Sequence, residues 1–180
     1  MKKLVIAILL LLSVSANAQV TKVTLQASGL TCSMCSNAIN KALKSVDYID
    51  KVYSNIKTST FDISFKPGAA INFDQLKKKV EDAGFFVAKF NATMLFDNVT
   101  IEEDTHVNIA GTMYHFVHVK NKVLTGEETI QVLDKGYVSA KEFKKNAAYT
   151  SMDCYKTGVA GTCCTKKGMN AGERIYHVTL

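Results

Sequence analysis

The sequence predicts an α+β protein, and three observations support this fold class. Segments in which apolar and polar residues alternate predict strands, and two segments with apolar residues three and four positions apart predict amphipathic helices. Over residues 20–92 these segments follow in the order strand, helix, strand, strand, helix, strand. That order is typical of a ferredoxin-like βαββαβ sandwich. Residues 93–180 contain mostly strand patterns and predict a small β-rich unit.

The first three elements follow from their apolar patterns. Val23, Leu25 and Ala27 alternate with polar residues and predict a half-buried strand. The helix behind it begins near Cys35, the first residue of a single apolar stripe. That stripe consists of Cys35, Ala38, Ile39, Ala42, Leu43 and Val46. Residues 49–56 predict a second strand, with a less regular pattern.

The other three elements of the sandwich have clearer ends. Residues 60–66 alternate between polar and apolar side chains and predict a strand, which Pro67-Gly68 ends. Residues 73–83 have helical spacing and are followed by Gly84, a helix stop signal. Residues 85–90 predict the last strand.

A Cys-x-x-Cys pair lies where the first strand meets the first helix. Cys32 and Cys35 are on a loop that enters the helix N-terminus, where the helix dipole and free backbone N–H groups favour a thiolate. Two such thiolates suit soft ions such as Cu(I), Hg(II), Zn(II) or Cd(II). The same spacing also occurs in structural disulfides and in redox pairs. Met34 is a candidate thioether ligand, although an exposed or loop-packed side chain is the stronger expectation.

With this motif and this element order, the βαββαβ segment resembles the heavy-metal-associated domain. That domain is the module of copper chaperones, copper-pump N-termini and periplasmic mercury-binding proteins. The family pattern is Gly-Met-Thr-Cys-x-x-Cys. Gly29, Thr31, Cys32 and Cys35 match it, and Leu30 replaces the Met. The resemblance implies that Leu30 packs under the loop and binds no metal.

The end of the second helix resembles the family as well. Residues 81–85 are Glu-Asp-Ala-Gly-Phe, and the resemblance places Phe85 near the metal loop. A lysine at that position would bring positive charge to a bound ion, which Phe85 cannot supply.

The N-terminus predicts export. Lys2 and Lys3 precede an apolar run at residues 4–12, and the Ala-Asn-Ala of residues 16–18 is a small-x-small cleavage site. We therefore expect a signal peptide at residues 1–18. The apolar run is shorter than the roughly 20 residues of a membrane-spanning helix, so we expect no stable membrane insertion after cleavage. The style of the signal is bacterial and predicts a periplasmic or secreted protein.

Charge and length limit the possible partners. The formal net charge is +6, and it falls to +4 without the two lysines of the signal peptide. Nucleic acid is a poor partner for an exported protein. Lysine runs predict a solvated surface, with an acidic docking partner as the alternative. We expect the metal-binding domain at residues 19–92 and a second, β-rich domain at residues 93–180.

The C-terminal half predicts short strands and one small helix. The strand patterns lie at residues 107–109, 113–119, 130–132 and 175–180. Ser139 and Glu142 form a capping box that predicts the start of the helix. These elements predict a β-rich domain, with a small OB-like barrel as a candidate architecture. We recognise no family in this half.

Three more cysteines, Cys154, Cys163 and Cys164, flank a segment predicted to be a loop. Two interpretations are open. A disulfide from Cys154 to one of the other two would close the loop and leave one cysteine over, because the chain has five. Alternatively, the three thiolates form a second soft-metal site, with Met152, Met169 or a histidine. A bond within the adjacent pair is disfavoured because it is strained.

The histidines and acids predict no catalytic site. His115 and His118 would point to opposite faces of one strand, so we do not expect them to bind one metal together. Each of the four histidines is expected to be a core or edge residue. These are His106, His115, His118 and His177. The sequence has no Ser-His-Asp arrangement, paired-acid motif or Gly-rich phosphate loop, and we do not expect an enzyme.

The sequence therefore predicts an exported protein that binds a soft metal, with Cu(I) expected and Hg(II) or Zn(II) as alternatives. By resemblance it would be a metallochaperone or scavenger. Cys32 and Cys35 would hold one Cu(I) in a near-linear site and pass it to a copper-transport or copper-accepting protein. One alternative function is Hg(II) capture. Another is thiol–disulfide exchange with Cys32 as the attacking thiolate, although the element order is not that of thioredoxin.

Overall fold

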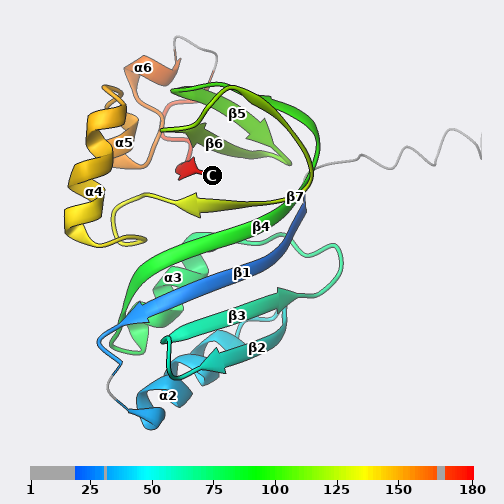
Figure 1. The fold of residues 1–180 in the computed structure, drawn as a ribbon, viewed down its shortest axis with the longest axis vertical. Helices are drawn as coiled ribbons and strands as arrows, with labels where there is room; N and C mark the ends of the chain where they lie inside the picture. Colours follow the sequence, from blue (N-terminus) through cyan, green and yellow to red (C-terminus); the bar gives the residue numbers. More distant parts are fainter. Residues whose placement is uncertain (1–18, 31, 166–168) are drawn as a thin grey trace, which may run out of the picture.

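The N-terminal elements form in the predicted order, in a computed structural model that describes residues 19–30, 32–165 and 169–180. They make a ferredoxin-like βαββαβ unit (Figure 1). The elements are β1 (Gln19–Ser28), α2 (Ser33–Lys44), β2 (Ile49–Asn55), β3 (Thr60–Phe65), α3 (Phe73–Asp82) and β4 (Phe86–Ile101). The expected signal peptide and Thr31 of the motif lie outside the described residues.

The two helices of this unit pack against each other behind the strands in the view of Figure 1. In α2 the buried residues are Ser36, Ile39 and Leu43, whereas Ala38 of the predicted stripe is exposed. The buried face therefore begins at Ser36, which lies under the Cys32 loop. In α3 the Asn72 side chain caps the helix by accepting a hydrogen bond from the Gln75 N–H at 3.0 Å.

The ends of α3 follow the predicted signals. Its buried residues are Phe73, Leu76 and Val80, one helical face. Gly84 follows with φ +87°, a left-handed conformation that favours glycine, and its N–H donates to the Glu81 carbonyl at 2.9 Å. This turn directs the chain into β4.

The last strand of the sandwich is longer than predicted. β4 continues to Ile101, because its alternate residues Phe90, Ala92, Met94 and Phe96 are all apolar and buried. β4 pairs along one edge with β1 and along the other with β7 (Lys122–Val132), both antiparallel. The expected domain boundary after residue 92 therefore lies inside a strand that both halves share.

The C-terminal half is β-rich, as predicted, and it extends the same sheet. Its remaining strands are β5 (Thr105–Ile109), β6 (Thr112–Phe116) and β8 (Ile175–Thr179). The order across the eight strands is β2-β3-β1-β4-β7-β8-β6-β5. Among the described residues, β2 and β5 are open edges, so the strands do not close into the OB-like barrel considered above. The reason is that β4 is already paired with β1 and β7.

Short helices cover one side of the C-terminal strands. They are α4 (Ala140–Asn146), the 3₁₀ turn η1 (Ala147–Tyr149), α5 (Cys154–Thr157) and α6 (Thr162–Thr165). The predicted capping box is present, since the Ser139 hydroxyl accepts from the Glu142 N–H at 3.2 Å. The segment predicted to be a loop instead begins with α5, which Gly158 caps at the C-terminal end with φ +74°. In the part of the chain that the structure describes, no helix has the length and apolar character needed to cross a bilayer.

One hydrophobic core runs under both halves. Phe90 of β4 lies between Phe73 of α3 and Tyr137 of the C-terminal half, with ring centroids 5.0 and 5.2 Å away. Phe73 also meets Tyr176 of β8 edge-on, at 5.2 Å. The two halves are thus joined by shared strands and by a shared aromatic cluster.

Candidate metal centres

Cys32 and Cys35 lie together at the N-terminus of α2. Their Sγ atoms are 2.8 Å apart. Cys32 is the N-cap of the helix: its Sγ accepts a hydrogen bond from the Cys35 N–H at 3.4 Å, and its carbonyl accepts from the Ser36 N–H at 3.3 Å. The first turn of the helix therefore holds both sulfur atoms on one side.

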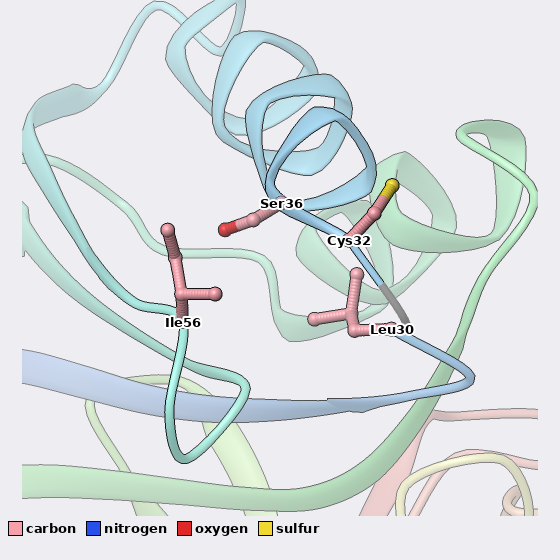
Figure 2. A pocket seen from close by; sticks show the side chains of 4 residues that line it. All are labelled: Leu30, Cys32, Ser36 and Ile56. Atoms are coloured by element: carbon pink, nitrogen blue, oxygen red, sulfur yellow. The ribbon is translucent and has the colours of Figure 1, made fainter.

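The loop presents this thiol pair to solvent. Cys32 is exposed and Cys35 is half-buried. Leu30 lies beneath Cys32 and packs against the core, as predicted, and the Cys32 sulfur points away from it (Figure 2). Met34 is 80 % exposed, which is the first of the two placements expected for it, exposed or packed on the loop. Phe85 is half-buried against the core.

Hydrogen bonds favour the thiolate of Cys32. The bond from the Cys35 side chain, and then the one from the Cys35 backbone N–H, lower the pKa of the Cys32 thiol. Burial acts in the opposite direction but is the smaller effect, because this side chain is exposed. A thiolate is the form of cysteine that attacks disulfides and binds metals.

The C-terminal cysteines lie near two histidines. Cys154 in α5 and Cys164 in α6 are both fully buried, and the side chain of Cys163 lies outside the described residues. The Cys154 Sγ is 3.7 Å from His106 Nε2 and 3.9 Å from His115 Nδ1. The Cys164 Sγ is 3.8 Å from the same nitrogen of His106. No disulfide joins Cys154 to Cys164 in the described part of the chain.

Strand register brings three histidines into one row. His106 of β5 is paired directly with His115 of β6, which in turn is paired with His177 of β8. Residues opposite one another in a sheet share a face, so the three rings lie side by side under α5 and α6. Sequence reasoning expected core or edge positions and missed this row. The local signal was the alternation of apolar and polar residues. It indicates on which face of the sheet a side chain lies, but it does not indicate which strand pairs with which.

His118 does not belong to this row. β6 ends at Phe116, so His118 lies beyond the strand that carries Tyr114 and Phe116. Its backbone is left-handed, with φ +58°, and its ring stacks on Tyr149 at 3.8 Å. As expected, His115 and His118 are not brought together.

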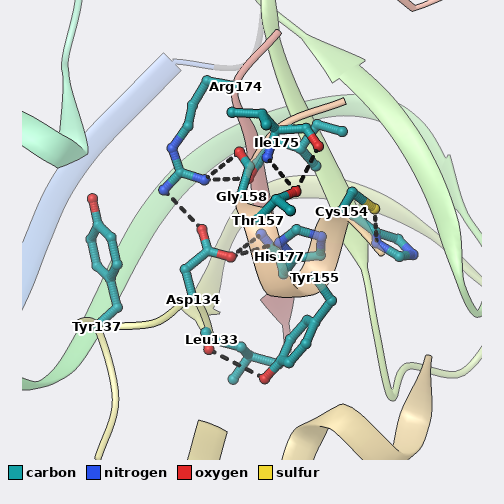
Figure 3. A network of polar contacts seen from close by, with 12 residues as sticks. Leu133, Asp134, Tyr137, Cys154, Tyr155, Thr157, Gly158, Arg174, Ile175 and His177 are labelled. Atoms are coloured by element: carbon teal, nitrogen blue, oxygen red, sulfur yellow. Dashed lines mark hydrogen bonds and ion pairs between the residues drawn. The ribbon is translucent and has the colours of Figure 1, made fainter. Parts of the chain in front are cut away.

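Two of the row's histidines are held by carboxylates. Asp104 Oδ1 lies 2.9 Å from His115 Nε2, and Asp134 Oδ1 lies 2.6 Å from His177 Nδ1. Figure 3 shows Asp134 between His177 and Arg174, whose Nη2 is 2.9 Å from Asp134 Oδ2. Burial, with the nearby His177 and His106, lowers the pKa of His115 to about 3, so this imidazole is neutral at pH 7.

The comparisons with known proteins concern the N-terminal half. Residues 24–86 match the family "Heavy-metal-associated domain". The periplasmic component of the mercuric transport protein from Pseudomonas fluorescens is 36 % identical over 86 residues, which are 47 % of this chain and 93 % of that protein. The chain belongs to the heavy-metal-associated domain family. Residues 87–180 lie outside the family match.

Two copper proteins match this heavy-metal-associated domain as well. Copper chaperone CopZ of Bacillus subtilis is 29 % identical over 66 residues, covering 37 % of this chain and 94 % of that protein. A copper-exporting P-type ATPase of Staphylococcus saprophyticus is 39 % identical over 57 residues, covering 32 % of this chain. The chain spans only 7 % of the length of that ATPase.

Proposed function

We propose that the protein is an exported Cu(I) carrier that binds one ion between Cys32 and Cys35. The observation that carries this proposal is the exposed thiol pair, with sulfur atoms 2.8 Å apart in the first turn of α2. Its function is to pass the ion to a copper-accepting or copper-transporting protein. It is a binding protein and not an enzyme.

The geometry suits a two-coordinate ion. Two metal–sulfur bonds of about 2.3 Å in a straight line need sulfur atoms about 4.6 Å apart. Because Cys32 is exposed, its side chain can rotate to widen the pair from 2.8 Å to this separation without moving the core. A two-coordinate ion at the surface stays open to attack by a partner's thiolates, so the ion moves by ligand exchange without release to water.

Sequence and relatives support this function. CopZ is named as a copper chaperone, and the chain covers nearly all of it. The basic and apolar N-terminal residues support export, and the Pseudomonas relative is named as a periplasmic component. That relative also supports a second candidate function, the capture of Hg(II), which is equally soft and favours two thiolates.

An anaerobic titration of the reduced chain with Cu(I), against a competing chelator, tests the proposal. We expect one tight equivalent that is lost in Cys32→Ser/Cys35→Ser and kept in Met34→Ala, since the Met34 side chain is exposed. The same titration with Hg(II) compares the two ions. Retention of the full Cu(I) affinity by the double variant would falsify the assignment, and tight binding of Hg(II) alone would favour mercury capture.

A further inference from the structure

We propose that His106, His115, Cys154 and Cys164 form a second, buried metal site for a borderline divalent ion of the Zn(II) type. This site is independent of Cys32 and Cys35. It lies in the half of the chain that the family match does not cover. The proposal rests on four observations: the four side chains converge, their sulfur–nitrogen distances suit one ion, a carboxylate orients one histidine, and the surrounding side chains are mostly buried.

The four donors converge from four separate elements. His106 and His115 come from paired positions of β5 and β6, and their rings stack at 4.2 Å with an angle of 17°. Cys154 comes from α5 and Cys164 from α6, the two short helices over that face of the sheet. The ligand atoms of His106, His115 and Cys154 all lie within 4.8 Å of one another.

The spacing of His106, His115 and Cys154 is that of ligands around one ion, and Cys164 adjoins them at His106. Bond lengths of about 2.3 Å to sulfur and 2.0–2.1 Å to nitrogen, at a tetrahedral angle, place the two donors about 3.6 Å apart. The three sulfur–nitrogen distances in the cluster are 3.7, 3.8 and 3.9 Å. These exceed the ideal by a few tenths of an ångström, so the ion would enter with small side-chain adjustments. A set of two thiolates and two imidazoles is typical of tetrahedral Zn(II).

Asp104 orients one ligand. Its Oδ1 lies 2.9 Å from His115 Nε2, so this nitrogen carries the proton and the lone pair of Nδ1 faces the Cys154 sulfur. Histidines that bind metals commonly donate their other N–H to a carboxylate in this way. Asp104 itself has φ +56°, a left-handed conformation that Asp and Asn both tolerate.

The surroundings are mostly buried and rich in sulfur. Cys154, Cys164 and His115 are fully buried, and Met113, Met152 and Met169 pack around the cysteines. A site in which three of the four ligands are fully buried and His106 is half-buried releases its ion more slowly than the exposed Cys32 pair. The two sites lie at opposite ends of the long axis of the molecule, α2 at one end and α6 with β5 at the other (Figure 1). An ion therefore cannot pass directly between them within one chain.

Cobalt(II) is the probe for this site, since it replaces Zn(II) and reports its own geometry. The chain carrying Cys32→Ser/Cys35→Ser is reduced, titrated anaerobically with Co(II), and followed by visible absorption. We expect one equivalent with intense tetrahedral d–d bands and a thiolate-to-metal charge-transfer band, both lost when Zn(II) is added. Adding Cys154→Ser should remove the charge-transfer contribution of that thiolate and weaken binding by more than tenfold. Octahedral spectra, or no binding, would overturn the proposal.

Asp104→Asn is the second variant, and it does not depend on changing a buried ligand. It keeps the left-handed turn but weakens the orienting bond, so affinity should fall about 10- to 100-fold while the tetrahedral spectrum remains. Glu102→Gln, an exposed acid two residues away, and His118→Ala, a histidine outside the row, are matched controls that should leave affinity unchanged. Far-UV circular dichroism checks that each variant is folded. Equal Co(II) affinity in the Cys32→Ser/Cys35→Ser chain alone and in that chain with Cys154→Ser or Asp104→Asn added would exclude the site.

Discussion

Asp74 and Arg174 form an ion pair across 100 residues of the chain, with Arg174 Nε 2.8 Å and Nη2 3.1 Å from the carboxylate oxygens. Asp74 belongs to the first turn of α3, and Arg174 directly precedes β8. The hydroxyls of Tyr137 and Tyr176 donate to the same carboxylate at 2.7 and 3.0 Å. One side chain of the heavy-metal-associated domain thus holds three groups of the C-terminal half.

Replacing Asp74 should therefore destabilise the whole molecule. Asp74→Asn removes the charge that four donated hydrogen bonds converge on, and we expect a loss of about 1–3 kcal/mol in the free energy of unfolding. Urea denaturation measures it. The matched control is Asp82→Asn, on the same helix, whose partner Lys78 is exposed. That variant should change stability by at most about 0.5 kcal/mol. If the two variants lost the same free energy of unfolding, Asp74 would contribute no more than an exposed residue does.

The same carboxylate predicts a dependence of stability on pH. Burial opposes its ionisation, but hydrogen bonds and charge from Arg174, with hydrogen bonds from the two tyrosines, outweigh this effect and hold the pKa of Asp74 below its ordinary value. The folded pKa is thus lower than the unfolded value of about 3.9. The stabilisation is complete above that value and is lost as pH falls through the folded pKa.

The measurement is the difference in unfolding free energy between wild type and Asp74→Asn across pH. We expect a constant difference from about pH 7 to 5, which shrinks below about pH 4. A difference that stays the same down to about pH 3 would contradict the depressed pKa.

The shared aromatic core predicts that the two halves unfold together. Phe90 is fully buried between Phe73 and Tyr137, so Phe90→Ala should cost about 3–5 kcal/mol. Amide hydrogen exchange should show the same loss of protection in β1 as in β8. Phe86→Ala is the control in the same strand, because Phe86 is 70 % exposed and its loss should change stability by only about 0.5 kcal/mol. Loss of protection confined to one half would show two independent units.

Because Cys32 is both an N-cap and a proposed metal ligand, two substitutions at this residue can distinguish its effect on stability from its effect on Cu(I) binding. Ser caps helices well, so Cys32→Ser should keep the stability of α2 while it removes the tight Cu(I) equivalent. Cys32→Ala lacks a capping group and should be less stable than Cys32→Ser by about 0.5–2 kcal/mol, with the same loss of Cu(I). Thermal unfolding and chelator competition on the two variants measure these effects. Equal stability would show that the Cys32 sulfur does not cap the helix.

The βαββαβ unit was predictable because its signals are local. Alternation over β1 and β3, helical spacing in α2 and α3, and the stop at Gly84 each depend on residues within a few positions of one another. The Cys32–Cys35 pair is equally local, since two cysteines three residues apart in a first helix turn must lie on the same side. The capping box at Ser139 was readable for the same reason.

The continuation of β4 was less visible. The first residues of β4 complete the βαββαβ sandwich by pairing with β1. An alternating pattern does not show whether another strand will pair with the opposite edge of β4. Only the pairing with β7, more than 20 residues later, shows that β4 belongs to both halves.

The sequence by itself determined the family of the N-terminal half, the position of its thiol pair and the β-rich character of the remainder. The tertiary structure decided which residues meet Cys154 and Cys164. His106 and His115 come from β5 and β6, which pair with each other, and β6 also pairs with the distant β8, so that His115 lies opposite His177. Such long-range pairing depends on how the whole core packs, and no local periodicity encodes it.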